Sequence, residues 1–279
     1  MFLNFDNIDV AVRGSGIIST NASLSSNNNI LAGYTLGVTK PMGQFPNGGI
    51  KSSFSFTYIP EISQDPNFAV AETIRNLIDR NTYFGEKIEF AGLSNSNFFM
   101  DSYSFRIQPN NLVEASATYT TYWETCGELR PKSNLIDYFN QGDLAHSYEV
   151  GFLDATDEVL NPVYDIAYEI RANWLPMYIL GRKTPIEIKL ISVSESLSFT
   201  MDESRNILFT GESVYPNIFA GNSGEMEFNN ISLFCQNNCG PDSSPYLSLN
   251  ISGFKIKSIT TSATVNEMVR TNYVASRYS

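Results

Sequence analysis

The sequence is poor in the residues that most enzymes use for catalysis and metal binding. It has 279 residues, of which one is His and three are Cys. A nucleophilic triad normally needs a His beside the nucleophile, and a structural zinc site needs about four ligands. The single His146 lies in a different segment from Cys235 and Cys239, which share a turn-like stretch. We therefore predict no catalytic residue, no metal and no cofactor, and leave open whether Cys235 and Cys239 pair.

Closely spaced carboxylates are the remaining candidates for acid–base chemistry. Three groups occur: Asp154 with Asp157 and Glu158, Glu86 with Glu89, and Glu225 with Glu227. The first group lacks the ligand spacing of an EF-hand loop and is interpreted as a solvated loop. The other two groups lie in similar blocks of sequence, which indicates a shared strand start and not a glycosidase pair. The sequence predicts a protein that is not an enzyme; a hydrolase using Asp154 and Asp157 is the alternative.

Basic residues are also scarce. Lys and Arg number 18 against 29 Asp and Glu, which gives a formal net charge of −11, and charged residues make up only 17% of the chain. Gripping duplex DNA through its phosphates needs clustered Lys and Arg, so the composition argues against that kind of DNA-binding protein. A like-charged surface instead repels a polyanion and lets it slide past.

Long apolar runs are absent as well. No stretch reaches the roughly 18 consecutive apolar residues of a transmembrane helix. The N-terminus has no basic region followed by an apolar segment, so we expect no signal peptide and no contact with a membrane. Disorder is excluded by the 19 Phe and 15 Tyr, because disordered chains contain few aromatic residues.

The dominant pattern that is present is the alternation of apolar and polar residues. It is clear in six segments: Ser53–Tyr58, Ser102–Ile107, Ala115–Trp123, Tyr164–Ala172, Ser196–Met201 and Leu247–Ile251. Such segments, bounded by Gly, Pro and Asn, are typical of half-buried antiparallel strands. Helical spacing occurs at 65–80, with Asp65 as N-cap and Pro66 as the first helical residue. A second, weaker helix is expected within 134–145. The sequence predicts a mainly β fold with one flanking helix.

The two halves of the sequence resemble each other. Five blocks recur in the same order at offsets of 139 to 149 residues: Tyr34–Gly37 and Tyr178–Gly181, Ser53–Thr57 and Ser196–Thr200, Gly85–Phe90 and Gly224–Phe228, Phe105–Gln108 and Phe254–Lys257, and Ser116–Tyr119 and Ser262–Val265. We interpret them as a tandem duplication. It divides the chain into a first β-domain at 1–125, an acidic connector at 126–160 and a second β-domain at 161–279. The alternative is two unrelated sheets of similar composition.

This pattern resembles the tail-tube fold of long-tailed bacteriophages. The resemblance is carried by the duplicated strand blocks, the helical segment 65–80 and the run Phe105–Tyr119, in which two alternating segments flank a turn. It implies two tandem antiparallel β-barrel or β-sandwich domains. It also implies that strands of neighbouring domains join edge to edge into a ring, which removes exposed strand edges. Stacked rings would form a tail tube whose bore conducts DNA.

The resemblance further implies a structural protein of the virion tail that is assembled in the host cytoplasm. Its expected partners are copies of itself, as a trimer or a hexamer, and other tail proteins such as sheath, baseplate or neck, with DNA as a passing cargo. The candidate residues of ring-forming strands are Ser102, Phe105, Ile107, Ala117, Tyr119, Phe254, Ile256 and Thr264. Two alternatives stay open: a hub, neck or terminator protein of the same fold, and a monomeric β-sandwich that binds a carbohydrate or a receptor.

Overall fold

The described part of the structure is mainly β. The computed structural model describes residues 10–17, 19–27, 30–33, 43–46, 49–62, 69–79, 85–128, 143–144, 150–153, 163–180, 182–202, 219–220, 225–226, 230–233, 247–250, 254–262 and 270–278. Within these ranges, strands account for nearly all regular structure, and there is one α-helix. The mainly β class predicted from the alternating pattern is confirmed.

The long strands coincide with the alternating segments of the sequence. In chain order the elements are β1 (Val10–Val12), β2 (Ser15–Gly16), β3 (Ser19–Asn27), β4 (Ile30–Gly33), β5 (Gly43–Pro46), β6 (Lys51–Tyr58), β7 (Glu61–Ile62), α1 (Ala69–Ile78), β8 (Glu86–Phe90), β9 (Leu93–Ile107), β10 (Glu114–Thr121), β11 (Cys126–Gly127), β12 (Asp143–Leu144), β13 (Val150–Leu153), β14 (Val163–Met177), β15 (Glu187–Asp202), β16 (Phe219–Ala220), β17 (Glu225–Met226), β18 (Asn230–Leu233), β19 (Leu247–Asn250), β20 (Lys255–Ser262) and β21 (Arg270–Tyr278). Five of the six predicted segments lie in or overlap one of the long strands, and the sixth, Leu247–Ile251, overlaps the short strand β19.

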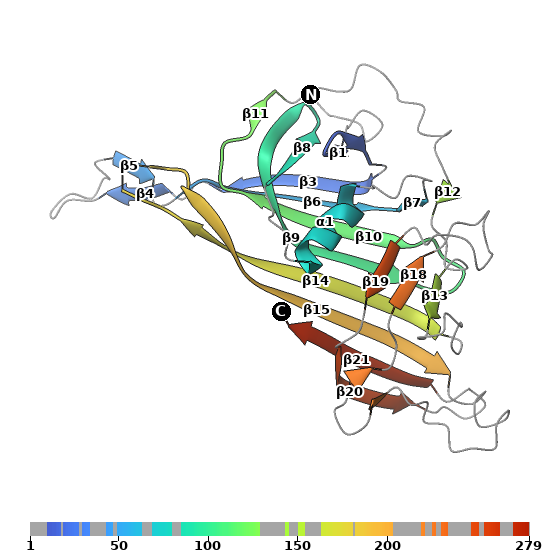
Figure 1. The fold of residues 1–279 in the computed structure, drawn as a ribbon. Coiled ribbons are helices and arrows are strands. Elements are labelled where there is room, and N and C mark those ends of the chain that lie inside the picture. The colour runs from blue at the N-terminus through green and yellow to red at the C-terminus, as the bar shows by residue number, and fades with distance from the viewer. Residues whose placement is uncertain are drawn as a thin grey trace, which may run out of the picture.

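One large antiparallel sheet contains the long strands (Figure 1). Its main order is β16-β17-β20-β21-β15-β14-β9-β10-β6-β3, and β1, β2, β8 and β11 attach beside it. The two halves of the chain meet where β14 pairs with β9. Smaller sheets are formed by β4–β5, by β7–β12 and by β13-β18-β19. The described strands thus form one open sheet that runs through both halves, and not two closed barrels.

The order of the strands repeats within this sheet. In the first half, the neighbours are β3, β6, β10 and β9, so the fourth long strand of the chain lies between the second and the third. In the second half, the neighbours are β14, β15, β21 and β20, which is the same arrangement. The strands β3, β6, β9 and β10 therefore correspond to β14, β15, β20 and β21.

β-Bulges confirm this correspondence residue by residue. In the β3–β6 pair, Thr20 is an extra residue without a partner in the register, opposite the step from Thr57 to Tyr58. In the β14–β15 pair, Tyr164 is the extra residue at the equivalent place, opposite the step from Thr200 to Met201. The β9–β10 pairing skips Asp101, and the β20–β21 pairing skips Lys257 in the equivalent position. Bulges are specific local features of a strand pair, so two matching bulges indicate one backbone design used twice.

The structure supports some of the repeated blocks and corrects others. Ser53–Thr57 and Ser196–Thr200 lie on the equivalent strands β6 and β15, and β8 and β17 each lie beside the third strand of their half. The last match is wrong, because Ser116 lies on β10 whereas Ser262 ends β20. The fourth match is out of register on the equivalent strands, because Phe105 lies near the end of β9 whereas Phe254 precedes the first residue of β20. The connection that precedes β20 is longer than the one that precedes β9, so a constant offset does not hold along the whole chain. Tyr34–Gly37 falls outside the described residues.

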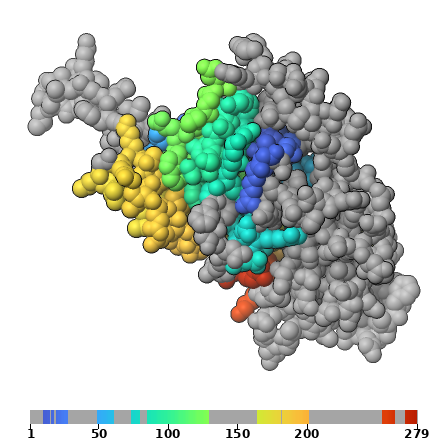
Figure 2. Space-filling model, turned by 45° about the horizontal axis from the view of Figure 1, so that its top comes forward, coloured from blue at the N-terminus to red at the C-terminus, as the bar shows by residue number. Residues whose placement is uncertain are grey.

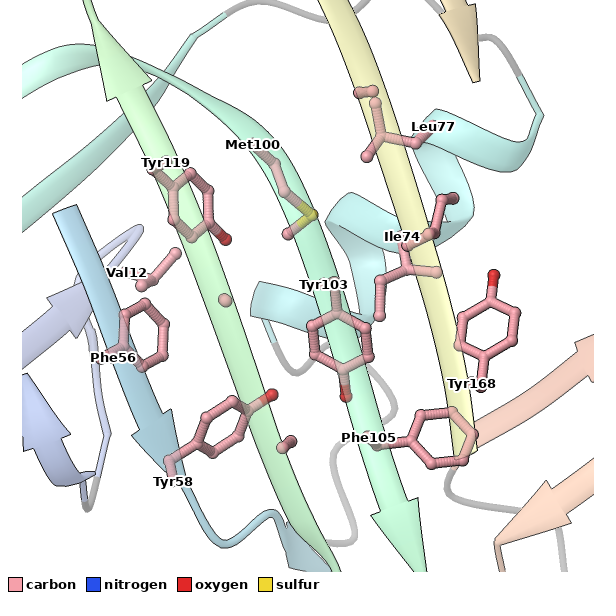
Figure 3. Packing of buried hydrophobic residues seen from close by; sticks show 14 of the residues in the cluster. Val12, Phe56, Tyr58, Ile74, Leu77, Met100, Tyr103, Phe105, Tyr119 and Tyr168 are labelled. Atoms are coloured by element: carbon pink, nitrogen blue, oxygen red, sulfur yellow. The ribbon is translucent and has the colours of Figure 1, made fainter. Parts of the chain in front are cut away.

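The helix α1 (Ala69–Ile78) lies inside the predicted segment 65–80. Its buried residues Ile74 and Leu77 are spaced by one helical turn and belong to the main hydrophobic cluster. Figure 3 shows both side chains in this cluster, which also includes Met100 and Tyr103 of β9. The second predicted helix falls largely outside the described residues, of which 143–144 form the strand β12.

The two faces of the large sheet differ in chemistry. One face carries aromatic and aliphatic side chains that form a continuous core, among them Phe56, Tyr119 and Phe199, which are buried. On the other face, Ser and Thr dominate, because the polar residues of each alternating strand all point there. This second face is called the polar face below; it and the sheet edges are the surfaces available to a partner.

Candidate assembly edges and polar sheet face

The two halves of the chain join along a seam between β9 and β14. Its six residue pairs run from Ile107 opposite Ile166 to Ser102 opposite Arg171. On the core side, the rings of Phe105 and Tyr168 stack with their centroids 5.3 Å apart. The indole Nε1–H of Trp174 donates a hydrogen bond of 2.7 Å to the carbonyl of Met100. The seam is therefore packed like a protein interior.

Charged side chains cross the same seam on the polar face. The guanidinium of Arg106 pairs with the carboxylate of Asp165 at 3.0 Å, and both side chains are substantially exposed. The hydrogen bond and charge of Asp165 raise the pKa of Arg106. Along β14, Arg171 pairs with Glu169 at 2.7 Å. Exposed pairs of this kind add little stability, about 0–1 kcal/mol each, but they cancel the two positive charges locally.

A buried ion pair joins strands of the second half on the core face of the sheet, next to the seam. Glu195 of β15 is 3% exposed, and Arg277 of β21 binds both of its carboxylate oxygens, at 2.8 and 2.9 Å. The Tyr168 hydroxyl donates a third hydrogen bond to Glu195, at 2.9 Å. Burial and the adjacent Glu195 charge raise the pKa of Tyr168 well above its ordinary value. The cluster links β14, β15 and β21, and the Arg277 guanidinium also lies over the Phe254 ring.

A second buried carboxylate connects the helix α1 to the strand β8 in the first half. Glu86 of β8 is 2% exposed; Arg13 pairs with it at 2.7 Å and the Thr73 hydroxyl of α1 donates to it. Burial raises the pKa of Glu86, and hydrogen bonds from Thr73, Tyr119 and Arg13 and the Arg13 charge oppose that rise. Arg13 and Gly14 both have positive φ, as the tight turn between β1 and β2 requires.

The outer edges of the sheet lie on β3 and β20. No described strand pairs with the outer side of β3, and β20 pairs there with β17 through Lys255 alone. Both strands are largely exposed and rich in hydroxyl side chains. An unpaired edge offers main-chain N–H and C=O groups to another chain. These two edges are the candidate assembly sites.

Hydroxyl groups form a ladder across the polar face. One continuous row of paired residues passes through seven strands: Asn21, Thr57, Ser116, Ser104, Glu169, Ser196 and Ser276. Neighbouring hydroxyls are hydrogen-bonded, Ser23 to Ser55 and Ser104 to Ser116, both at 2.8 Å. A hollow of about 600 Å³ crosses the seam on this face, lined from β6 to β21. The polar face is therefore hollowed at the seam and lined mainly by small neutral groups.

The hairpin of β14 and β15 projects from the body of the molecule as an arm. The arm is the part of the hairpin beyond Arg171, where the pairing of β14 with β9 ends. The hairpin is yellow to orange in Figure 2, on the left of the coloured surface beside the green strands. Large apolar side chains of the arm are exposed: Leu175, Met177, Tyr178, Ile179, Leu180, Ile186 and Ile191. Single exposed apolar residues are ordinary, but a group of them marks a contact surface.

The structure places the candidate ring-forming residues at three locations. Ser102, Phe105 and Ile107 lie on β9 and form the seam inside the chain. Ala117 and Tyr119 lie on β10, which has β6 on one side and β9 on the other. Phe254 and Ile256 lie at the start of β20, and Thr264 is outside the described residues.

Sequence reasoning missed β3 as an edge and Glu195 with Arg277 as a buried pair. The signal for β3 is its high content of Ser and Asn on both faces, which is typical of a strand with one free side. Glu195 stands at an apolar position of an alternating strand, and such a position for a carboxylate predicts a buried partner.

The described ranges contain few groups that could take part in metal or cofactor chemistry. There, no three His, Cys, Asp or Glu side chains gather in one place. Cys126 is a free and exposed thiol. His146, Cys235, Cys239, Asp154, Asp157 and Glu158 all lie outside those ranges. Within them, no helix has the length and apolar character to cross a membrane.

No protein-family model matches the chain, and no curated protein matches it either. The features of the molecule from which a function can be proposed are the seam, the edges and the polar face.

Proposed function

We propose that the chain is a structural protein of a phage tail that assembles into rings around a DNA-conducting channel. The observation that carries the proposal is the repeated sheet, in which the second half attaches to the first edge to edge. Each half then corresponds to one tube-like domain, with boundaries near 1–125 and 161–279. A module that pairs with its own copy inside one chain has the means to pair with the next chain in the same way.

Head-to-tail pairing of this kind leads to a ring. Each half has two different edge strands, one at each side of its four long strands. Contacts between successive chains therefore join two unlike surfaces and are heterologous. Heterologous contacts close into rings when the sheet curves, and closure removes every exposed edge. The hollow across the seam supports curvature toward the polar face.

The seam favours a trimer over a hexamer. Both halves of the chain lie side by side in one sheet, so both belong to the same ring. Three chains then supply the six domains that the tail-tube resemblance implies, with eight long strands from each chain. A barrel of that many strands has a backbone diameter of about 45–50 Å, from a strand spacing of about 4.8 Å and tilts of about 35–45°. Such a bore admits a DNA duplex.

The polar face suits the wall of this channel. Small hydroxyl side chains dominate it, and its arginines Arg106 and Arg171 are paired with carboxylates. Clustered and unpaired Lys and Arg would release phosphate counterions and hold DNA, and the ion pairs of Arg106 and Arg171 remove these two cations from that role. Neutral hydroxyls and a net negative chain let a polyanion pass.

Negative-stain electron microscopy of the purified chain, combined with sedimentation velocity over a concentration series, tests the proposal. We expect rings with a central hole and threefold symmetry at high concentration. Addition of tail components from a disrupted virion lowers the concentration at which rings form. Particles of 31.1 kDa at every concentration, with no rings on any tail component, would overturn the proposal.

The exposed arm is the observation that favours the second candidate, a monomeric β-sandwich that binds a receptor or carbohydrate. Aromatic and aliphatic groups such as Tyr178 and Leu180 occur at such binding surfaces. A monomer that binds a glycan, and loses this binding on Tyr178→Ala, would favour this candidate.

A further inference from the structure

We infer that successive chains join through β3 of one chain and β20 of the next, in the register of the internal β9–β14 seam. The inference rests on the proposed function, since it specifies the contact by which the ring closes. The partner is a second copy of this chain. Each step follows from the internal repeat of the sheet.

The first step is the equivalence of β3 and β14. Ala22 and Leu24 of β3 lie opposite Phe56 and Phe54 of β6. Ile166 and Tyr168 of β14 lie opposite Phe199 and Leu197 of β15, which are the equivalents of Phe56 and Phe54. In this alignment, the β14 residues that form the seam, 166–171, correspond to residues 22–27 of β3. The outer side of β3 thus matches the side of β14 that pairs with β9.

The second step is the equivalence of β9 and β20. Tyr103 lies opposite Ala117 in the first half, and Ile259 lies opposite Tyr273 in the second. Ala117 and Tyr273 are equivalent because they pair with Phe56 and Phe199. The small strands also agree: β8 covers the first part of β9, and β17 covers the first residue of β20. No described strand pairs with residues 258–262 of β20 on the side where residues 102–106 of β9 bind β14.

The exposure of Ile259 is independent support for a missing neighbour. Tyr103, its equivalent, is 3% exposed, whereas Ile259 is 43% exposed. Tyr103 has β14 beside it and belongs to the core cluster with Ile74 and Leu77 of α1, whereas no described strand lies beside Ile259, which is not part of that cluster. An arriving β3 covers Ile259 as β14 covers Tyr103.

The register between chains follows from these two equivalences. The expected pairs are Leu24 with Thr261, Ser25 with Thr260, Ser26 with Ile259 and Asn27 with Ser258. Leu24 and Ile259 then both lie on the core side, and Ser25 and Thr260 on the polar face. A shift by one residue would turn every side chain to the wrong face, so the register is well defined.

This contact is chemically weaker than the seam that it copies. Leu24 and Thr261 stand where the stacked rings of Tyr168 and Phe105 stand, and Asn21 and Ser262 stand where Asp165 and Arg106 form their ion pair. The contact between chains consists mainly of main-chain hydrogen bonds. We therefore expect ring closure to be reversible and dependent on concentration.

A disulfide cross-linking experiment tests the register. Ser25→Cys and Thr260→Cys are introduced into separate chains in a background in which Cys126, Cys235 and Cys239 are replaced by Ser, so that no native thiol remains. Opposed residues of an antiparallel pair lie about 4.5–5.5 Å apart between Cα atoms, within the range of a disulfide. Mild oxidation of the mixed chains is expected to give a dimer band, and neither chain alone gives it. Peptide mass spectrometry locates the link between positions 25 and 260.

The matched control uses Ser23→Cys mixed with Ser258→Cys. These positions lie on the same two strands and the same face but are four residues out of register, about 13 Å apart. We expect at least a tenfold slower cross-link. A chain that carries both Ser25→Cys and Thr260→Cys is expected to give bands up to the ring size and none beyond.

The outcomes separate this inference from the proposed function. Rings in the microscope without the link between positions 25 and 260, or with the control pair linking equally fast, would refute the β3–β20 register and leave the ring in place. Absence of both rings and links would refute the proposed function and the inference with it.

Discussion

The β9–β14 seam and the open edges on β3 and β20 have equivalent backbones and different side chains. At the seam, Phe105 and Tyr168 are almost fully buried and stack on each other. At the open edges, the equivalent positions are Thr261 and Leu24, and Ile259 remains exposed. The same strand geometry thus occurs once inside a packed core and once at edges with which no described strand pairs along most of their length.

This difference separates folding from assembly. A seam with aromatic packing forms as the chain folds, because hydrophobic burial stabilises it without any partner. Edges that carry hydroxyl groups stay soluble as long as they are unpaired, and hydroxyl-rich edges attract less unspecific association than apolar ones. Four substitutions test the comparison, described from the largest expected effect on the stability of the isolated chain to the smallest.

Phe105→Ala breaks the seam itself. Removing a buried Phe side chain leaves a cavity beside Tyr168, and we expect a loss of about 3–5 kcal/mol in the free energy of unfolding. Urea unfolding followed by circular dichroism measures it. Leu24→Ala, at the half-buried edge position equivalent to Tyr168, is the matched control and should cost about 1 kcal/mol. Equal costs at the two positions would contradict the distinction between seam and edge.

Arg277→Ala breaks the buried pair behind the seam. Glu195 then remains buried without its cation, and removal of one partner of such a pair costs about 3 kcal/mol. The double variant Glu195→Gln with Arg277→Met leaves no buried charge and is expected to recover most of the loss. Unfolding in urea gives both values, and a double variant as unstable as Arg277→Ala would show that the pair acts through packing alone.

Glu86→Gln tests the carboxylate that fastens α1, through the dependence of stability on pH. Burial raises the pKa of Glu86 above its ordinary value of 4.5. The folded chain therefore binds more protons than the unfolded chain between the two pKa values. The contribution of the neutral group is fully present below pH 4.5 and is lost as pH rises through the raised pKa. Unfolding curves at several pH values should show this decline in the native chain and a flatter profile in Glu86→Gln.

Thr260→Lys acts on the open edge and has the smallest effect on the folded chain. Thr260 is exposed, so the change in stability should stay within about 0.5 kcal/mol. Assembly should be abolished, because a charge on an edge strand opposes pairing. Sedimentation velocity measures assembly. Ser96→Lys is the control, since Ser96 is exposed on a part of β9 away from the seam. Rings formed by Thr260→Lys as readily as by the native chain would argue against β20 as an edge.

The sequence predicted the strands well and their neighbours less well. Alternation identifies segments such as Ser53–Tyr58, because one face of each strand must meet the core. Alternation does not identify which strands pair. It therefore could not predict the seam between β9 and β14 or the position of β10 between β6 and β9. The constant offset between the halves failed after β15, where the connection is longer in the second half.

The candidate site was predictable only in part. Ser102 and Phe105 are predicted to lie on ring-forming strands, and in the structure their strand β9 pairs with β14 of the same chain. The role of β3 depends on what lies beside it, which is a property of the folded sheet and not of its own nine residues. Glu195 and Arg277 lie far apart in sequence, and only the β15–β21 pairing brings them together.

The covalent link between the two halves restricts the symmetry of any closed assembly. Every chain brings its repeats in pairs, so a ring built from this chain alone contains an even number of repeats. The two kinds of junction, β9 with β14 and β3 with β20, alternate around it. The order of its rotational symmetry is therefore half the number of its repeats. A partner whose symmetry matches the number of repeats can bind at near-equivalent positions. A partner whose symmetry matches the number of chains can distinguish the two kinds of repeat.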